Sequence, residues 1–195
     1  MSPSRSVETG TPLSHGEPLP SQPPPRRYCG SAFPAYRFIP GRNPHPSRDP
    51  KGHSYGVSRA VATRFEPSEW RASTDYLYGV DLFNYCYWWE AHETWEGIWV
   101  TVGRRTPMGQ FMQGLIQVSV AHLKRFQGLN GSADRLLRKG FARMARSGGR
   151  FLGIEIEMFK REVEAYFTGT RAIAPLIQLV GFSAEPQAQE TLGGL

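Results

Sequence analysis

The sequence has few cysteines and no long apolar run. Its two cysteines, Cys29 and Cys86, stand in unrelated contexts, so we predict no disulfide framework and a reducing compartment such as the cytoplasm. No apolar stretch approaches the roughly 20 residues that a membrane span needs. The first residues, MSPSRSVETG, have no apolar stretch after the charges, so we predict no signal peptide and no membrane partner.

Basic residues are concentrated at the start of the chain. The formal net charge is +6, of which +5 lies in residues 1–60 and +1 in residues 61–195. The later part is therefore close to neutral, and nucleic-acid binding through the basic arm is the weakest of three functional hypotheses.

Composition divides the chain into four parts. Residues 1–30 are rich in Pro, Ser and Gly, and we predict a disordered tail because they hold too little apolar surface to offset ordering. Residues 31–57 form a Pro- and His-rich extended strap, residues 58–182 a helical domain, and residues 183–195 a frayed tail. The strap, FPAYRFIPGRNPHPSRDPKGHSYG, excludes helix through its prolines.

The strap histidines allow two interpretations. In one, His45 or His53 reaches the polar stripe of the 85–100 helix, set out below, as an acid/base group or a third metal ligand. In the other, Tyr36 and Phe38 hold the strap while both histidines are solvated. The sequence leaves both open.

Apolar spacing predicts helices over 74–84, 85–100, 108–127, 133–144 and 155–168. Ser73 or Thr74 caps the first, the 108–127 helix is apolar on nearly all sides, and residues 171–180 lay an apolar strip along the bundle. His122 in the central helix has the pattern of a core histidine. The predicted fold is all-α: one compact antiparallel bundle of about five helices behind the strap.

The stretch Tyr78–Val100 breaks the expected pattern. At 100° per residue, one predicted inward stripe carries these side chains: Tyr85, Trp89, His92, Glu93, Glu96, Trp99 and Val100. Glu90 falls on the opposite side. Because a buried carboxylate must be paired, protonated or metal-bound, the stripe is either a structural polar network or a working site.

As a working site, the stripe predicts acid/base chemistry of a hydrolase-like kind on a small molecule. Glu93 or Glu96 would carry the proton with a pKa raised by the aromatic surroundings, and His92 would orient it. Trp89 and Trp99 would line the site. Gln113 and Gln117, on one stripe of the central helix, would pair with the two acids.

A divalent metal is a further possibility at this site. His92-Glu93-x-x-Glu96 differs from the zincin pattern H-E-x-x-H at its last position. His92 and Glu96 can still supply two ligands, but a catalytic metal needs a third.

The alternative to an enzyme is a protein-interaction module. Its surface would be the strap or the basic face of the 133–144 helix, which carries Arg135, Lys139, Arg143 and Arg146. That face is either simply solvated or binds an acidic partner or nucleic acid.

Three motifs carry a family resemblance. Gly79-Val80-Asp81-Leu82-Phe83-Asn84, the Trp89–Trp99 motif WEAHETWEGIW and Gln113-Gly114-Leu115-Ile116-Gln117 resemble the family called domain of unknown function 309, over about residues 68–180. The resemblance implies a compact, all-helical, soluble domain, mostly prokaryotic, and it carries no assigned activity. Cys86 stands where the family pattern has a small residue such as Gly or Ala.

Overall fold

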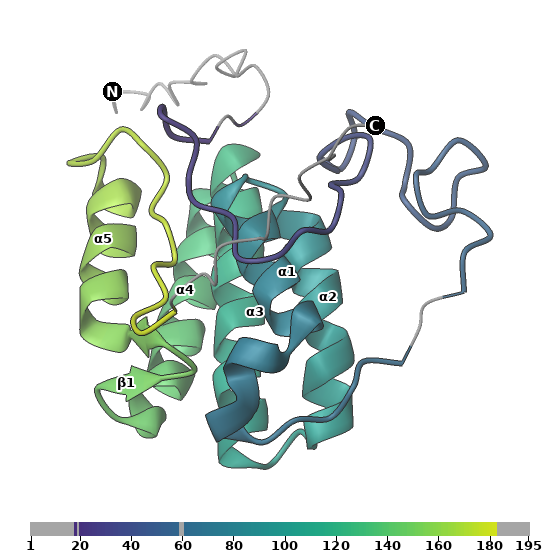
Figure 1. The fold of residues 1–195 in the computed structure, drawn as a ribbon. Coiled ribbons are helices and arrows are strands. Elements are labelled where there is room, and N and C mark those ends of the chain that lie inside the picture. The colour runs from purple at the N-terminus through teal and green to yellow at the C-terminus, as the bar shows by residue number, and fades with distance from the viewer. Residues whose placement is uncertain (1–17, 19, 59–60, 183–195) are drawn as a thin grey trace, which may run out of the picture.

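The computed structural model describes residues 18, 20–58 and 61–182. In these residues the 3-10 helix η1 (Pro67–Ala72) precedes α1 (Thr74–Asn84), α2 (Trp88–Val102), α3 (Pro107–Phe126) and α4 (Asn130–Met144). The 3-10 turn η2 (Ala145–Ser147) then leads through a hairpin of β1 (Arg150–Phe151) and β2 (Ile154–Glu155) to α5 (Ile156–Thr168). The predicted all-α bundle of about five helices is confirmed, and the antiparallel hairpin is added to it (Figure 1).

Two of the helices, α1 and α3, begin at a side chain that caps them. Ser73 Oγ accepts a hydrogen bond from the Tyr76 N–H at 3.3 Å, so Ser73 is the cap of α1. Thr106 does the same for α3 through the Gly109 N–H at 2.9 Å, and Pro107 follows it. Such caps satisfy backbone donors that have no partner within the helix.

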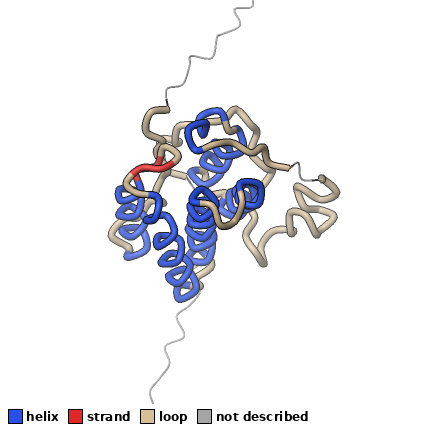
Figure 2. The backbone as a smooth tube through the Cα atoms, turned by 90° about the horizontal axis from the view of Figure 1, so that it is seen from below, coloured by secondary structure: helices blue, strands red, loops and turns tan. Residues whose placement is uncertain are grey.

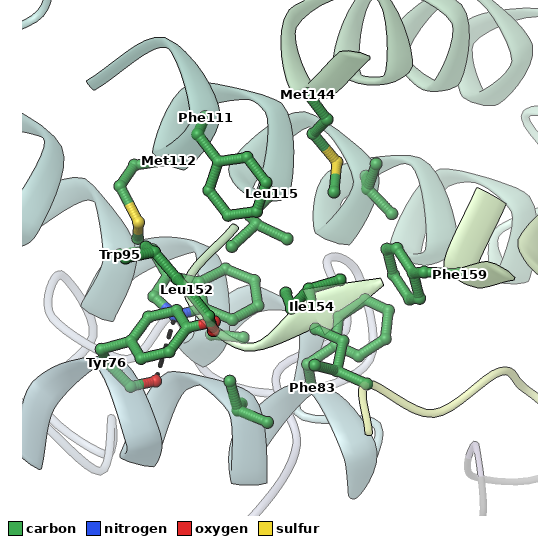
Figure 3. Packing of buried hydrophobic residues seen from close by; sticks show 14 of the residues in the cluster. Tyr76, Phe83, Trp95, Phe111, Met112, Leu115, Met144, Leu152, Ile154 and Phe159 are labelled. Carbon is green, nitrogen blue, oxygen red and sulfur yellow. Dashed lines mark hydrogen bonds between the residues drawn. The ribbon is translucent and has the colours of Figure 1, made fainter. Parts of the chain in front are cut away.

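Helix α3 is the centre of the core, packed between α2 and α4. It approaches α4 closely at two glycines, since a Cβ on Gly140 would lie only 2.9 Å from the Gly114 carbonyl oxygen. Figure 3 shows buried side chains that meet around it: Tyr76, Phe83, Trp95, Phe111, Met112, Leu115, Met144, Leu152, Ile154 and Phe159.

His122 belongs to this core. It is fully buried, its Nδ1–H donates to the Val118 carbonyl at 2.8 Å, and its ring stacks on Tyr166. Burial lowers the pKa of His122 to about 4, so the ring is neutral near pH 7. His122 is thus a packed core histidine.

The inward face of α2 is not the predicted one. Its buried hydrophobic residues are Trp88, Ala91, Trp95, Ile98 and Val102. Val100 is 55% exposed, so the stripe prediction was wrong for it. The reason lies in α1, because Gly79 leaves room for the Trp95 indole, which any Cβ at that position would overlap.

The turn between α1 and α2 passes through Cys86. This buried residue has a φ of +64°, in the left-handed region that favours glycine. Glycine is therefore what the backbone itself prefers at this position.

The chain before α1 is bound to the helices. Asp81 on α1 is fully buried and accepts hydrogen bonds from Arg27 Nε at 3.0 Å, Tyr28 N at 2.8 Å and Cys29 N at 2.9 Å. Residues 27–29 had been assigned to the disordered tail, so the attached part of the chain begins earlier than its composition indicated. Residues 1–17 and 19 lie outside the described residues. Figure 2 shows the helices grouped together with loops around them.

The predicted apolar strip after α5 is present. Asn84 binds the Ile177 backbone in both directions, at 2.9 and 2.7 Å, and the Leu179 N–H donates to the Tyr28 hydroxyl at 3.0 Å. Both Ile177 and Leu179 are buried. None of the helices among the described residues is long and apolar enough to cross a membrane.

Candidate functional site

The strap folds back on itself before it meets α2. The Tyr36 hydroxyl donates to the Pro44 carbonyl at 2.7 Å and accepts from the His53 N–H at 3.2 Å. The Ser54 N–H donates to the Pro46 carbonyl at 2.9 Å. These bonds close residues 36–54 into a loop, and its conformation places the His53 side chain against the helix.

Glu90, in the first turn of α2, is the acid that the strap covers. Its side chain is 6% exposed, and its Oε1 accepts from the Phe38 N–H at 2.9 Å. His53 Nε2 lies 3.1 Å from the same oxygen, with its ring 8% exposed. An ionised carboxylate can only accept, so toward ionised Glu90 the His53 Nε2 carries the proton.

The second carboxylate oxygen of Glu90, Oε2, differs from the first in its hydrogen bonding. Oε2 is buried and has no hydrogen-bond partner among the described residues. Burial raises the pKa of Glu90, while its hydrogen bonds, those from His53 and Phe38 among them, act in the opposite direction. A proton bound to this carboxyl would sit on Oε2, because Oε1 accepts two hydrogen bonds.

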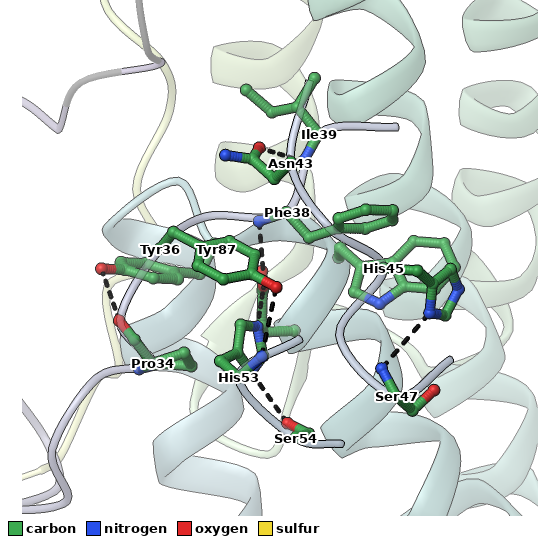
Figure 4. A network of polar contacts seen from close by, with 12 residues as sticks. Pro34, Tyr36, Phe38, Ile39, Asn43, His45, Ser47, His53, Ser54 and Tyr87 are labelled. Atoms are coloured by element: carbon green, nitrogen blue, oxygen red, sulfur yellow. Dashed lines mark hydrogen bonds and ion pairs between the residues drawn. The ribbon is translucent and has the colours of Figure 1, made fainter. Parts of the chain in front are cut away.

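Glu90 lines a pocket of about 220 Å³ between the strap and the α1–α2 pair. Its polar walls include His53, Ser54, Glu93 and Thr94, and further lining comes from these residues: Pro34, Pro46, Ser47, Tyr78, Leu82 and Trp89. His53 Nδ1 lies 2.8 Å from Ser54 Oγ, a contact drawn in Figure 4. The pocket thus brings a buried acid, an imidazole and a hydroxyl together.

The predicted cluster of His92, Glu93 and Glu96 lies on the same helix. All three are half-buried, and one ligand atom from each falls within 4.8 Å of the others. His92 Nδ1–H donates to the Trp89 carbonyl at 2.8 Å, so its Nε2 keeps a lone pair. Glu93 also lines the pocket, and it connects the cluster to the Glu90 site.

The other predicted binding residues are divided between two places. Trp89 lines the pocket, and His45 packs at its edge, 5.6 Å from the Trp89 ring centre and 5.1 Å from that of Phe38. Trp99 lies further along α2 under the guanidinium of Arg104, 4.7 Å from its ring centre. Of the two strap histidines, His53 is therefore the one that reaches an acid on α2.

Gln117 lies at the contact between α3 and α4, where a Cβ on Gly140 would be 3.3 Å from its Cβ. Its Oε1 is buried without a hydrogen-bond partner in the described part of the chain. Gln113, one turn earlier, is half-buried. Pairing of these amides with Glu93 and Glu96 stays a prediction.

The predicted basic face covers α4 and the η2 turn after it, and three of its four residues are open to solvent. Arg135, Lys139 and Arg146 are exposed, and Arg143 is half-buried. A role in binding an acidic partner or nucleic acid stays a prediction.

Sequence reasoning missed Glu90 and Ser54. Glu90 was assigned to the side of the helix away from the aromatic stripe, where an acid is normally solvated. Its burial comes from the strap, which is 37 or more residues away in sequence and covers that side. A helical wheel contains no signal for such a cover. Ser54 follows His53 directly in the sequence, and this adjacency was the available sign that its hydroxyl lies near the imidazole.

Residues 76–136 match the model of a family described as a domain of unknown function, DUF309. The matched span runs from α1 into α4. It includes Asp81, Glu90 and the His92 cluster, and the strap lies outside it. The resemblance seen in the sequence is confirmed over these residues. No curated protein and no solved structure gives a significant match to the chain.

Proposed function

We propose that the pocket beside Glu90 binds a small organic molecule, neutral or positively charged, and that Glu90 and His53 exchange a proton with it. The supporting observation is that Glu90, whose buried Oε2 has no hydrogen-bond partner among the described residues, lines the pocket. A buried polar atom without a partner costs roughly 1–3 kcal/mol. A ligand that offers a donor or acceptor at this oxygen would recover that free energy.

The charges on the pocket walls favour a neutral or positively charged ligand. Two carboxylates, Glu90 and Glu93, face a pocket whose histidine is already bonded to one of them. The Trp89 ring adds a π-face that attracts cations. Anionic ligands are disfavoured by this arrangement. At about 220 Å³ the pocket is smaller than the roughly 300–1,000 Å³ of drug-sized sites, so the ligand is small.

The proton chemistry follows from the two Glu90 oxygens. Oε1 is fixed by Phe38 and His53, whereas Oε2 has no partner among the described residues and is the oxygen on which we place the carboxyl proton. A carboxyl whose pKa is raised by burial holds its proton closer to neutral pH, which suits a general acid. Acid/base catalysis of this kind contributes typically 10²–10⁴-fold.

The test is a thermal-shift screen of small amines, amides, alcohols and esters. We expect compounds that raise the melting temperature of the wild type and lose that effect in Glu90→Gln. The matched control is Glu157→Gln, an exposed acid on α5 paired with Lys160 at 3.0 Å, which should respond as the wild type does. Equal shifts in both variants, or no stabilising compound, would contradict the proposal.

A divalent metal held by His92, Glu93 and Glu96 is the second candidate, favoured by the convergence of their ligand atoms within 4.8 Å. The backbone bond of His92 Nδ1 suits a metal-binding histidine, and its Nε2 faces Glu93 Oε1 at 3.5 Å, the side on which a shared ion would lie. Calorimetric titration with Zn²⁺ and Mn²⁺ should show one site in the wild type and none in His92→Ala. Binding that survives in His92→Ala would rule this site out.

A further inference from the structure

The end of the strap presents a serine hydroxyl to the same pocket. Ser54 lines it, and its Oγ lies 2.8 Å from His53 Nδ1. The Ser54 N–H is tied to the Pro46 carbonyl, and a Cβ on Gly52 would overlap the backbone of His45 and Pro46. The loop is therefore closely packed just before the hydroxyl, which fixes where Ser54 stands.

The direction of the protons follows from Glu90. An ionised Glu90 carboxylate can only accept, so His53 Nε2 is the donor toward Oε1 at 3.1 Å, beside the Phe38 N–H that the same oxygen accepts. In a neutral imidazole the other nitrogen is then an acceptor. Nδ1 consequently accepts the Ser54 hydroxyl proton. The arrangement holds whether or not Oε2 carries a proton.

Ser54, His53 and Glu90 thus form a chain of hydroxyl, imidazole and buried carboxyl along one pocket wall. An activated nucleophile has this pattern: a hydroxyl within reach of a base, and the base oriented by a third group. Relative to the well-known serine hydrolase arrangement the two imidazole nitrogens exchange roles, and the polarity of the chain is the same.

We propose that Ser54 is the nucleophile of an acyl-transfer site whose substrate is a small carboxylic ester without negative charge. The inference rests on the proposed function of the Glu90 pocket, and it assigns a substrate class to it. His53 acts as the base, and Glu90 is a positioning residue that holds the imidazole through Oε1.

The reaction balances with water as the second substrate. Ser54 Oγ forms a bond to the ester carbonyl carbon while its proton moves to His53 Nδ1. The C–O bond to the alcohol then breaks, and the alcohol leaves with that proton. Water attacks the acyl-serine, gives its proton to His53, and the proton returns to Ser54 as the acid departs.

The test uses diisopropyl fluorophosphate, which forms an O–P bond with an activated serine and releases fluoride. We expect labelling at Ser54 in the wild type, located by peptide mass spectrometry, and none in Ser54→Ala. In His53→Ala the labelling rate should fall by about 100-fold or more. Ser58→Ala removes an exposed serine outside the pocket lining and should label like the wild type.

Two substitutions separate positioning by Glu90 from a structural role. Glu90→Gln keeps an acceptor for His53, so it should retain part of the labelling rate and shift its pH profile. Glu90→Leu has no acceptor and should lose most of the rate. Hydrolysis of p-nitrophenyl acetate should follow the same order. Equal rates in the two variants would contradict the assigned role.

Labelling at another residue, or labelling that persists in Ser54→Ala, would overturn the assignment of Ser54 as the nucleophile. A wild-type protein that is not labelled at all would overturn this assignment too. If the thermal-shift screen still finds compounds that depend on Glu90, and Ser54→Ala responds to them like the wild type, the pocket stands and only the nucleophile fails. If neither labelling nor stabilisation is seen, both proposals fail together.

Discussion

Asp81 on α1 and Glu90 on α2 are two buried carboxylates that the N-terminal segment covers. They differ in how many of their carboxylate oxygens are hydrogen-bonded. Asp81 is fully buried and both of its oxygens are used, by two backbone N–H groups and by Arg27. Glu90 is bound through Oε1 alone, and Oε2 remains without a partner in the described residues. A saturated carboxylate fixes the chain, whereas a half-saturated one leaves a group for chemistry.

The difference extends to the surroundings of the two acids. A cation and two backbone N–H donors face Asp81. A single backbone N–H and a histidine face Glu90, and a pocket lies beside it. The comparison predicts that substitution at Asp81 mainly affects stability and that substitution at Glu90 mainly affects what the pocket binds.

Asp81→Asn should have the larger effect on folding. The amide places an NH₂ group against donors that now meet an oxygen, so a backbone N–H of Tyr28 or Cys29 loses its acceptor. We expect a loss of roughly 2–4 kcal/mol in the free energy of unfolding, measured by urea denaturation. Asp134→Asn, an exposed acid on α4, should change it by less than about 0.5 kcal/mol. A loss at Asp81 as small as that of the control would break the comparison.

The sequence was sufficient to predict the helices and insufficient to predict what covers them. Ser73 and Pro107 stand at the starts of α1 and α3, and the helical spacing of apolar residues predicts the rest of both helices. The face of α2 was mistaken because the helix carries tryptophans on two stripes. One stripe holds Trp88 and Trp95, the other Trp89 and Trp99. Both fit a helical period, and only the contact with Gly79 selects Trp95 for the core.

The candidate site was predicted in part for the same reason. Periodicity located the acid-rich helix, because His92, Glu93 and Glu96 lie within a few residues of one another. The pairing of His53 with Glu90 joins residues 37 positions apart, and no local pattern encodes such a contact. One interpretation had His45 or His53 reaching the polar stripe of the helix, and the other had both histidines solvated. The structure instead places His53 against Glu90, outside that stripe.

Glu90→Gln should change the free energy of unfolding less than Asp81→Asn does, and the size of that change should depend on pH. The raised pKa of Glu90 means that the folded chain holds this proton to higher pH than the unfolded chain does. Folding stability linked to this group is therefore complete below the usual pKa near 4.5 and falls as pH rises through the folded value. Glutamine cannot ionise, so that decline should be absent from Glu90→Gln.

Urea denaturation of both proteins over a series of pH values measures this difference. His53, on the strap, is hydrogen-bonded to Glu90, and Glu93, on α2, lines the same pocket, so the difference between the two pH curves reports Glu90 together with its contact to His53. Near neutral pH we expect the variant to lie within about 1 kcal/mol of the wild type or above it, because it buries no charge. Parallel curves would mean that Glu90 is as well satisfied as Asp81, and the distinction between a fixed acid and a reactive one would be lost.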